Sequence, residues 1–488
     1  MADTVAPGSA SRDLAQRALD TATARGASYA DVRIIGRRWE EFIFSNGVLD
    51  AFEDGDDLGF GVRVLAGGAW GFAASPVLTE HEADRVAAQA VEIAMSAGPL
   101  AWPVSLGPPQ THVFAGRGPC EHDPFAVPFE DKVALLARCD EEMRAEPAVT
   151  VAQGTLDFLN ETRLFASTEG SEIYQDLTDS GGGLKVIVVR RGEQQQRTYP
   201  QVFGWHAERG GWEAIERMGL VPNARRIGAE AAELLDAPPC PEGPATVILD
   251  AAQTAMQVHE SLGHALELDR VLGMEAATAG TSFLTPDKLG SFRVGSDVVT
   301  VVADPGTPRA AGGFFFDDDG VPARRVPLIE RGRVAEYLSA RDSAAALGRT
   351  SSGASRAAGW NRLPLVRMTV VNLEPGTWPL SDLIADTDRG LLLETTASWS
   401  IDDRRLEFEF ATETAREIRG GQMGRLYRGP AYRGSTPRFW RACDAVADAD
   451  SWHLFSLRMC FKGQPGQLVR VTHGAAPARF RAVDIIPR

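Results

Sequence analysis

The amino-acid sequence predicts an α+β protein. We expect an N-terminal α/β domain with an antiparallel sheet and long helices, followed by a strand-rich C-terminal domain. Three observations favour this class. The 488 residues exceed one ordinary core, and the 49 glycines and 29 prolines indicate many turns. Segments with helical spacing also alternate with period-two runs. The Ala237-Pro238-Pro239 run predicts a boundary between 1–236 and 237–488.

The N-terminal domain has two candidate sub-parts, 1–98 and 128–236. A proline-rich stretch over 99–128 is typical of a linker between them. Apolar residues recur at helical spacing in four segments of this domain. The first predicted helix begins at Ser11 and ends at Gly26. The other three cover Leu78–Ala97, Phe129–Arg144 and Gly210–Leu235.

Between these helices, turn signals divide the chain into short strands. Asn46-Gly47 and Asp54-Gly55 are typical of hairpin turns. Further breaks are expected at Asn160-Glu161, Glu169-Gly170 and the Gly181–Gly183 triplet. The predicted strands are Asp31–Ile35, Glu41–Ser45, Val48–Glu53 and Gly59–Leu65, followed by a meander from Val149 to Tyr199.

The C-terminal domain opens with a strand that runs directly into a helix. The strand is Ala245–Leu249, and the helix starts at Ala251 with Asp250 as its N-cap. Gln253 is placed to complete a capping box. Further strands are expected at Val298–Val302, Val326–Glu330, Val334–Leu338, Arg367–Leu373, Gly390–Glu394, Glu407–Ala415 and Leu468–Val471.

The charge and cysteine content narrow the function. A formal net charge of −16 with scattered basic residues disfavours binding to nucleic acid or to an anionic membrane surface. Five widely spaced cysteines without a CxxC pair fit a reducing compartment better than a disulfide scaffold. The sequence has neither a signal-peptide pattern nor a stretch long enough to span a membrane. We therefore expect a soluble, cytoplasmic protein.

The helix after Asp250 contains His259-Glu260-Ser261-Leu262-Gly263-His264. Neutral imidazoles are favoured zinc ligands, but a straight helix separates residues i and i+5 by about 140°. A π-bulge brings them to one face, and Gly263 is a natural place for the backbone to deform. The spacing therefore predicts a metal site held by His259 and His264.

Catalytic zinc needs a third protein ligand and an open position. The spacing leaves several candidates: Glu267, Asp269, His453, His473 and the cysteines. Glu260, directly after a ligand, is placed at the edge of the metal rather than on it. Such a carboxylate can take a proton from an activated water and pass it to a leaving amine. We therefore predict Glu260 as the general base.

Beyond this motif, the chain resembles the TldD subfamily of TldD/PmbA metalloproteases over nearly its whole length. The resemblance lies in His259-Glu260-x-x-x-His264-Ala265-Leu266-Glu267-x-Asp269, Val301–Asp304, Phe316–Gly320, Leu328–Gly332, Leu363-Pro364-x-x-Arg367-Met368, Leu373–Gly376 and Cys460-x-Lys462–Gln467, and in Gly61–Arg63 and Trp70–Ala73 near the N-terminus.

The resemblance implies a zinc site completed by Cys460, because that cysteine matches the third ligand of the family. It also implies a catalytic subunit that forms a heterodimer with a TldE/PmbA-type paralogue, with a homodimer as the alternative. Substrates would be unfolded proteins or the leader peptides of ribosomally made natural products. One departure is Phe461, where the family pattern has glycine.

Two other functions remain open at this stage. The family's older names suggest a non-catalytic modulator of DNA gyrase, and a zinc site of this kind can also hydrolyse a non-peptide amide. Outside the motif, Asp317–Asp319 is typical of a solvated turn, and Arg356, Asn361 and Arg367 are candidates for the substrate path.

Overall fold

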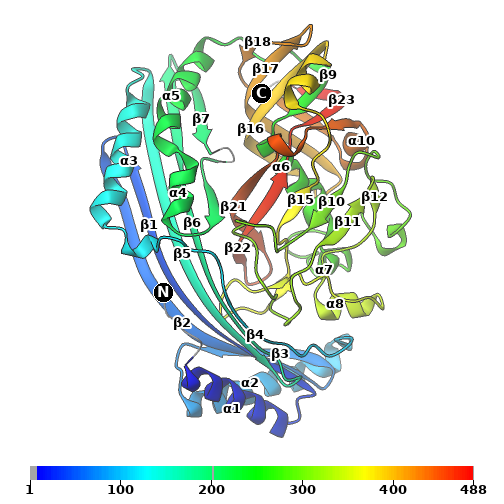
Figure 1. Ribbon diagram of the computed structural model, residues 1–488. Helices are drawn as coiled ribbons and strands as arrows, with labels where there is room; N and C mark the ends of the chain where they lie inside the picture. Colours follow the sequence, from blue (N-terminus) through cyan, green and yellow to red (C-terminus); the bar gives the residue numbers. More distant parts are fainter. Residues whose placement is uncertain (1–7, 201–202, 487–488) are drawn as a thin grey trace.

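The computed structural model describes residues 8–200 and 203–486 and has the α+β architecture that the sequence predicts (Figure 1). All strands of one eight-stranded sheet precede residue 210, and all strands of a second, seven-stranded sheet follow residue 242. Among the described residues, no helix combines the length and the apolar character that a membrane span requires.

The first sheet is built from long strands in the order β3-β2-β1-β5-β6-β4, and β7 and β8 also pair with β6. Its pairs are antiparallel except for β4 with β6, which is parallel. The strands are β1 (Tyr29–Ser45), β2 (Val48–Ala66), β3 (Ala69–Ser75), β4 (Val113–Arg117), β5 (Val149–Ser167), β6 (Glu172–Arg190), β7 (Glu193–Tyr199) and β8 (His206–Arg209).

Five helices cover this sheet in two groups, seen at opposite ends of the long strands in Figure 1. One group packs its alanine-rich faces on β1 and β2, and the other packs on β5 and β6. Burial of these apolar stripes fixes the helices on the sheet. The first group is α1 (Ser9–Ala24) and α2 (Glu80–Ala97), and the second is α3 (Phe129–Arg144), α4 (Trp212–Met218) and α5 (Leu220–Asp236).

Several turn predictions in this sheet are wrong. The Asn46-Gly47 turn is present, but β2 runs through Asp54-Gly55, and β5 runs through Asn160-Glu161. The Gly181–Gly183 triplet lies inside β6 and is not a turn. A Cβ at Gly183 would lie 1.9 Å from the Gly204 carbonyl oxygen, so the glycine permits close packing. Because each of these positions is paired with a neighbouring long strand, ladder hydrogen bonds override the local turn propensity.

Three further expectations in the N-terminal half also need correction. The first helix begins at Ser9, and Ser11 lies inside it. The proline-rich stretch is not only a linker, because β4 within it pairs with β6. The long helix predicted over 210–235 is broken by Gly219, whose φ of 58° is readily adopted only by glycine.

The second sheet contains a closed ring of five strands, because β16 pairs with both β9 and β17. The ring continues from β17 through β19 and β23 back to β9, while β18 and β20 pair outside it. The strands are β9 (Gly243–Leu249), β16 (Arg389–Ile401), β17 (Glu407–Arg419), β18 (Gln422–Tyr427), β19 (Ala431–Ser435), β20 (Cys443–Val446) and β23 (Ala478–Ile486).

Smaller elements complete this half. Most of its expected strands are present. Between 298 and 373, the strand predicted at Val326–Glu330 has the predicted bounds, whereas the other three are shorter than predicted or interrupted. The strands are β10 (Val301–Ala303), β11 (Val326–Glu330), β12 (Arg333–Val334), β13 (Ser355–Arg356), β14 (Leu365–Val366), β15 (Val371–Leu373), β21 (His453–Lys462) and β22 (Gln467–Ala475). The helices are α6 (Ala251–Val258), α7 (Leu268–Val271), α8 (Arg341–Ala346), α9 (Leu380–Ala385) and α10 (Thr436–Arg441).

The C-terminal half lies against the concave side of the first sheet (Figure 1), and a buried turn ties the two together. Asp317–Asp319 is not the solvated turn that the sequence predicts, because all three side chains are at most 3% exposed. Arg63 binds Asp319 at 2.8 Å, and Arg163 pairs with Asp318. Local sequence could not predict these pairs, since both arginines come from the first sheet.

Candidate metal centre

The helix that carries the histidines is fixed at its start by Asp250. This residue follows β9, and its Oδ1 accepts a hydrogen bond of 2.6 Å from the backbone N–H of Gln253, so the predicted N-cap is confirmed. The capping box is wrong. The amide of Gln253 instead contacts the hydroxyls of Tyr432, at 2.7 Å, and Thr396, at 2.6 Å. These bonds anchor the buried helix α6 to the strand ring.

The backbone changes form immediately after α6. Residues His259–Gly263 (η3) form a π-helical turn, and His264–Leu266 (η4) a 3₁₀ turn. The predicted π-bulge is thus confirmed. A Cβ at Gly263 would lie 2.3 Å from Sδ of Met368, so only glycine fits this turn without displacing its neighbour. The wider turn places the rings of His259 and His264 with centroids 4.7 Å apart.

A third donor reaches this pair from the C-terminal hairpin. Cys460 on β21 places its Sγ 3.8 Å from Nε2 of His264. One donor atom from each of His259, His264 and Cys460 lies within 4.8 Å of the others, and all three side chains are at most 5% exposed. Two nitrogens and a sulfur form the donor set that zinc prefers.

Hydrogen bonds assign the tautomer of His259. The Val371 carbonyl can only accept, so Nδ1 of His473, 2.9 Å away, donates to it. Burial lowers the pKa of His473 to about 4, so its Nε2 is an unprotonated acceptor. Nδ1 of His259, 2.7 Å from that atom, must then donate. This leaves the lone pair of His259 on Nε2, free to bind a metal.

A carboxylate does the same for the second histidine. Glu267 Oε2 lies 3.0 Å from Nδ1 of His264 and accepts a hydrogen bond from its N–H, which leaves Nε2 unprotonated with its lone pair free. Burial acts to raise the pKa of Glu267, but Lys462 and His264 hold it well below its usual range. Burial also lowers the pKa of His264 to about 3, so its imidazole is neutral. Both histidines are therefore neutral and carry an unprotonated Nε2.

Glu260 lies at the edge of this cluster and is oriented by an arginine. Nη1 of Arg405 donates to its Oε2 at 2.6 Å, while its Oε1 lies 3.8 Å from Nε2 of His259. Burial raises the pKa of Glu260, and Arg405 opposes that shift. One carboxylate oxygen is thus anchored and the other faces the donors. Arg405 lies 145 residues along the chain from Glu260, and no sequence pattern predicted it.

The other candidate ligands lie elsewhere or act indirectly. His473 and Glu267 orient the histidines, and Asp269 binds Nζ of Lys462 at 2.6 Å. His453 is exposed on β21, and the four remaining cysteines are not part of the cluster. Of the residues proposed for the substrate path, Arg367 is fully buried and donates to the Cys460 carbonyl, and Asn361 is exposed.

A cleft of about 850 Å³ opens onto the cluster and is lined by His259, Glu260, His264 and Cys460. Its walls carry four exposed apolar side chains, two of them on β21: Phe203, Trp399, Met459 and Phe461. Phe461, which departs from the family pattern, is 53% exposed at this cleft. Its ring also packs against Gly466, since a Cβ at that glycine would lie only 2.4 Å from a ring carbon of Phe461.

Family models match the chain along most of its length. They are described as PmbA/TldA metallopeptidase domain 1, matching residues 30–94, the central domain, matching 122–237, and the C-terminal domain, matching 242–485. A metalloprotease of Methanocaldococcus jannaschii is 28% identical, and the match spans 92% of this chain and 95% of the relative's length. A zinc metalloprotease TldD homolog of Saccharolobus solfataricus is 22% identical, covering 94% and 97%.

Solved structures share the fold. A protein of Thermotoga maritima, described as a candidate modulator of a DNA gyrase, superposes with a TM-score of 0.76 at 16% identity. The superposition spans 97% of this chain and 100% of that protein. TldE of Thermococcus kodakarensis superposes with a TM-score of 0.73 at 16% identity, covering 98% and 99%. At these identities the likeness concerns the fold alone.

Proposed function

Because the chain belongs to the PmbA/TldD metallopeptidase family, we propose that it is a zinc-dependent peptidase whose metal is held by His259, His264 and Cys460. One observation carries the proposal. The hydrogen bonds assign both tautomers with Nε2 unprotonated, and a ring nitrogen of each histidine lies within 4.8 Å of the Cys460 sulfur. Three protein ligands leave the fourth position for chemistry.

A zinc ion at this position supplies Lewis acidity, which lowers the pKa of a coordinated water and polarises a peptide carbonyl. Glu260 Oε1 would accept a proton from the attacking water and would transfer it to the leaving amine. Arg405 holds the other carboxylate oxygen, so Glu260 keeps one orientation during the transfer. Burial raises the Glu260 pKa toward the range in which a carboxylate both accepts and returns a proton.

We propose an unfolded peptide or a leader peptide as the substrate, bound as an added strand. The outer part of β16 offers an edge for it: β17 pairs along the whole of β16, whereas β9 pairs only with Leu391–Leu393. Trp399, Ser400 and Ile401 on this outer part line the cleft. Main-chain pairing to a strand edge would place the substrate carbonyls beside the donors with weak sequence preference.

The family further supports a heterodimer with a TldE/PmbA-type paralogue, with a homodimer as the alternative, and we propose a cytoplasmic location. The five cysteines are all free, which fits a reducing compartment.

The test is to purify the chain with and without such a partner, measure bound metal, and assay cleavage of an unstructured peptide. We expect Glu260→Gln to retain zinc and to lose cleavage by at least about a hundredfold. Glu130→Gln, at an exposed position, is the matched control. Equal cleavage by wild type and Glu260→Gln would refute the proposed base.

The same assays separate two alternative functions. A modulator without catalysis would show no cleavage in wild type whatever its metal content. A hydrolase of non-peptide amides would cleave small amides and leave peptides intact. The buried Glu260, with one oxygen held by Arg405 and the other 3.8 Å from Nε2 of His259, favours catalysis, since binding alone has no use for that carboxylate.

A further inference from the structure

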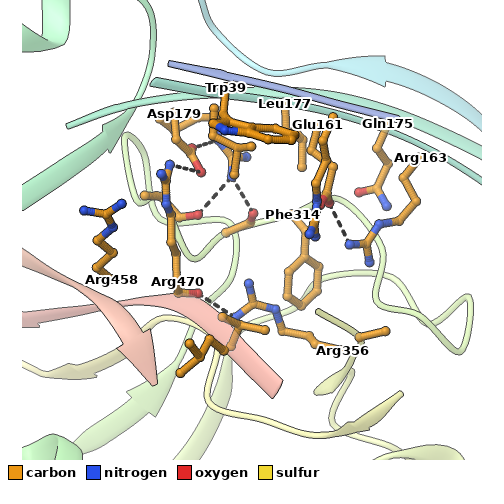
Figure 2. A pocket seen from close by; sticks show the side chains of 18 of the residues that line it. Trp39, Glu161, Arg163, Gln175, Leu177, Asp179, Phe314, Arg356, Arg458 and Arg470 are labelled. Carbon is orange, nitrogen blue, oxygen red and sulfur yellow. Dashed lines mark hydrogen bonds and ion pairs between the residues drawn. The ribbon is translucent and has the colours of Figure 1, made fainter. Parts of the chain in front are cut away.

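A second cavity, of about 700 Å³, lies between the concave face of the first sheet and the C-terminal half. Figure 2 shows Trp39, Glu161 and Leu177 on the sheet side, and Arg356, Arg458 and Arg470 reaching toward them from the opposite wall. The cavity is comparable in volume to sites that hold small ligands.

Nearly all the arginines that line this cavity are neutralised by carboxylates of its own walls. Arg37 and Arg163 both bind Glu161, at 2.5 and 2.6 Å. The same holds for Arg209 of the first sheet and for the two arginines of the opposite wall, which form a second network. Its pairs are Arg209 with Asp179, Arg470 with Asp157, and Arg458 with Glu41 and Asp157.

Arg356 is the exception. Its Nη1 donates to the carbonyl oxygens of Met368 and Arg470, both at 3.0 Å, and these bonds hold the guanidinium in place. Within 8–200 and 203–486, no carboxylate lies within ion-pair distance of it, and its Nε and Nη2 make no hydrogen bond. Phe314 lies beside the guanidinium, with its ring centre 5.8 Å away.

The environment of this arginine disfavours an isolated charge. Burial and the neighbouring cations Arg367 and Arg163 lower the pKa of Arg356 to about 10, although the more distant carboxylates of Asp318 and Glu161 act against this shift. Arg356 is only partly buried, and a partly desolvated cation without a counter-ion at its side is a candidate for completion by a ligand. Two free N–H groups on a planar guanidinium match the two oxygens of a carboxylate.

The cavity adjoins the metal cleft. Arg458 and Met459, at the irregular pairing of β21, line both spaces. A ligand that extends past these residues therefore lies in both. Because the metal cleft is proposed to hold a peptide, its occupant would reach Arg356 with a side chain or with its chain end.

We infer that the Arg356 cavity binds a carboxylate of the peptide substrate, supplied by its C-terminus or by an Asp or Glu side chain. This inference rests on the proposed peptidase function and adds a specificity element to it. A single unpaired guanidinium matches one negative charge. A dianionic phosphate would meet repulsion from Asp157, Asp179 and Glu161 in the walls.

The test measures peptide binding to the full-length Glu260→Gln chain by fluorescence anisotropy. One peptide pair carries no acidic side chain and ends in a free acid or in an amide. A second pair ends in an amide and carries a central Glu or Gln. We expect about tenfold tighter binding of the acid in at least one pair. The pair that responds identifies whether the chain end or the side chain is bound.

Arg356→Gln should abolish this preference and Arg356→Lys should retain part of it, while Arg425→Gln, at an exposed position on β18, should leave it unchanged. Equal affinity for acid and amide in both pairs would overturn the inference without using any variant at Arg356. So would a preference that persists in Arg356→Gln.

The outcome is separable from that of the proposed function. Wild-type cleavage without an acid preference contradicts only the carboxylate site. An acid preference that depends on Arg356, without any cleavage by wild type, contradicts only the peptidase.

Discussion

The hydrogen bond between His473 and His259 leads to a testable prediction, because His473 contacts the proposed metal ligand and is not itself one of the proposed ligands. His473→Phe keeps a ring of similar size on β22 and removes the acceptor for the Nδ1 proton of His259. His259 is only 3% exposed, so that N–H would be left buried without a partner. The unprotonated Nε2 would also lose the bond that selects its tautomer.

The expected size of the effect follows from these contacts. A buried donor without a partner costs about 1–3 kcal/mol, and each 1.4 kcal/mol is about tenfold in an equilibrium constant. We therefore expect zinc affinity to fall about 10- to 100-fold, as is typical when a residue that orients a ligand is lost. Phenylalanine also leaves the Val371 carbonyl without its donor, so thermal stability must be measured alongside.

The assay is competition for zinc with a chromophoric chelator at fixed pH. His453→Phe is the matched control, since His453 lies on the same hairpin but is exposed. Zinc affinity of His473→Phe within twofold of wild type, with the fold intact, would refute the tautomer assignment. Equal losses in both variants would show a general effect on the hairpin.

Three further predictions concern the site and the interface. Cys460→Ser should lose bound zinc under chelator competition while Cys443→Ser keeps it; equal retention would remove Cys460 from the ligand set. Gly263→Ala forces a Cβ against Met368, so zinc content should fall and stability should drop by about 1–3 kcal/mol, and an unchanged melting temperature would argue against the tight turn. Burial acts to raise the pKa of Glu161, but its two arginine partners lower it to about 2. Its contribution, on the order of 3 kcal/mol, is present above its unfolded pKa near 4.5 and is lost as pH falls through 2. In urea titrations, Glu161→Gln should therefore be destabilised at pH 7, and the difference from wild type should shrink on acidification; a pH-independent difference would contradict this.

Figure 2 places Glu161 opposite Arg356, so its charge belongs both to the interface of the two halves and to the proposed carboxylate cavity. Glu161→Gln should then change peptide preference as well as stability. Removing this negative charge favours an anion at Arg356.

The sequence alone predicted features that depend on neighbouring residues. The N-cap at Asp250, the five-residue separation of His259 and His264, and the glycine between them are encoded within one segment, and a helical backbone has few ways to bring such positions together. The apolar spacing of α2 and α3 likewise predicted both helices, because an amphipathic stripe needs only a surface to cover.

Only the tertiary structure decided what depends on distant pairing. The Gly181–Gly183 triplet lies within a strand because sheet partners on either side outweigh its turn propensity. Asp317–Asp319 is buried because arginines about 150 or more residues earlier in the chain neutralise it. The same separation hid the roles of His473 and Arg405 and the isolated charge of Arg356. Contacts between residues far apart in sequence are set by tertiary packing, which local sequence patterns do not predict.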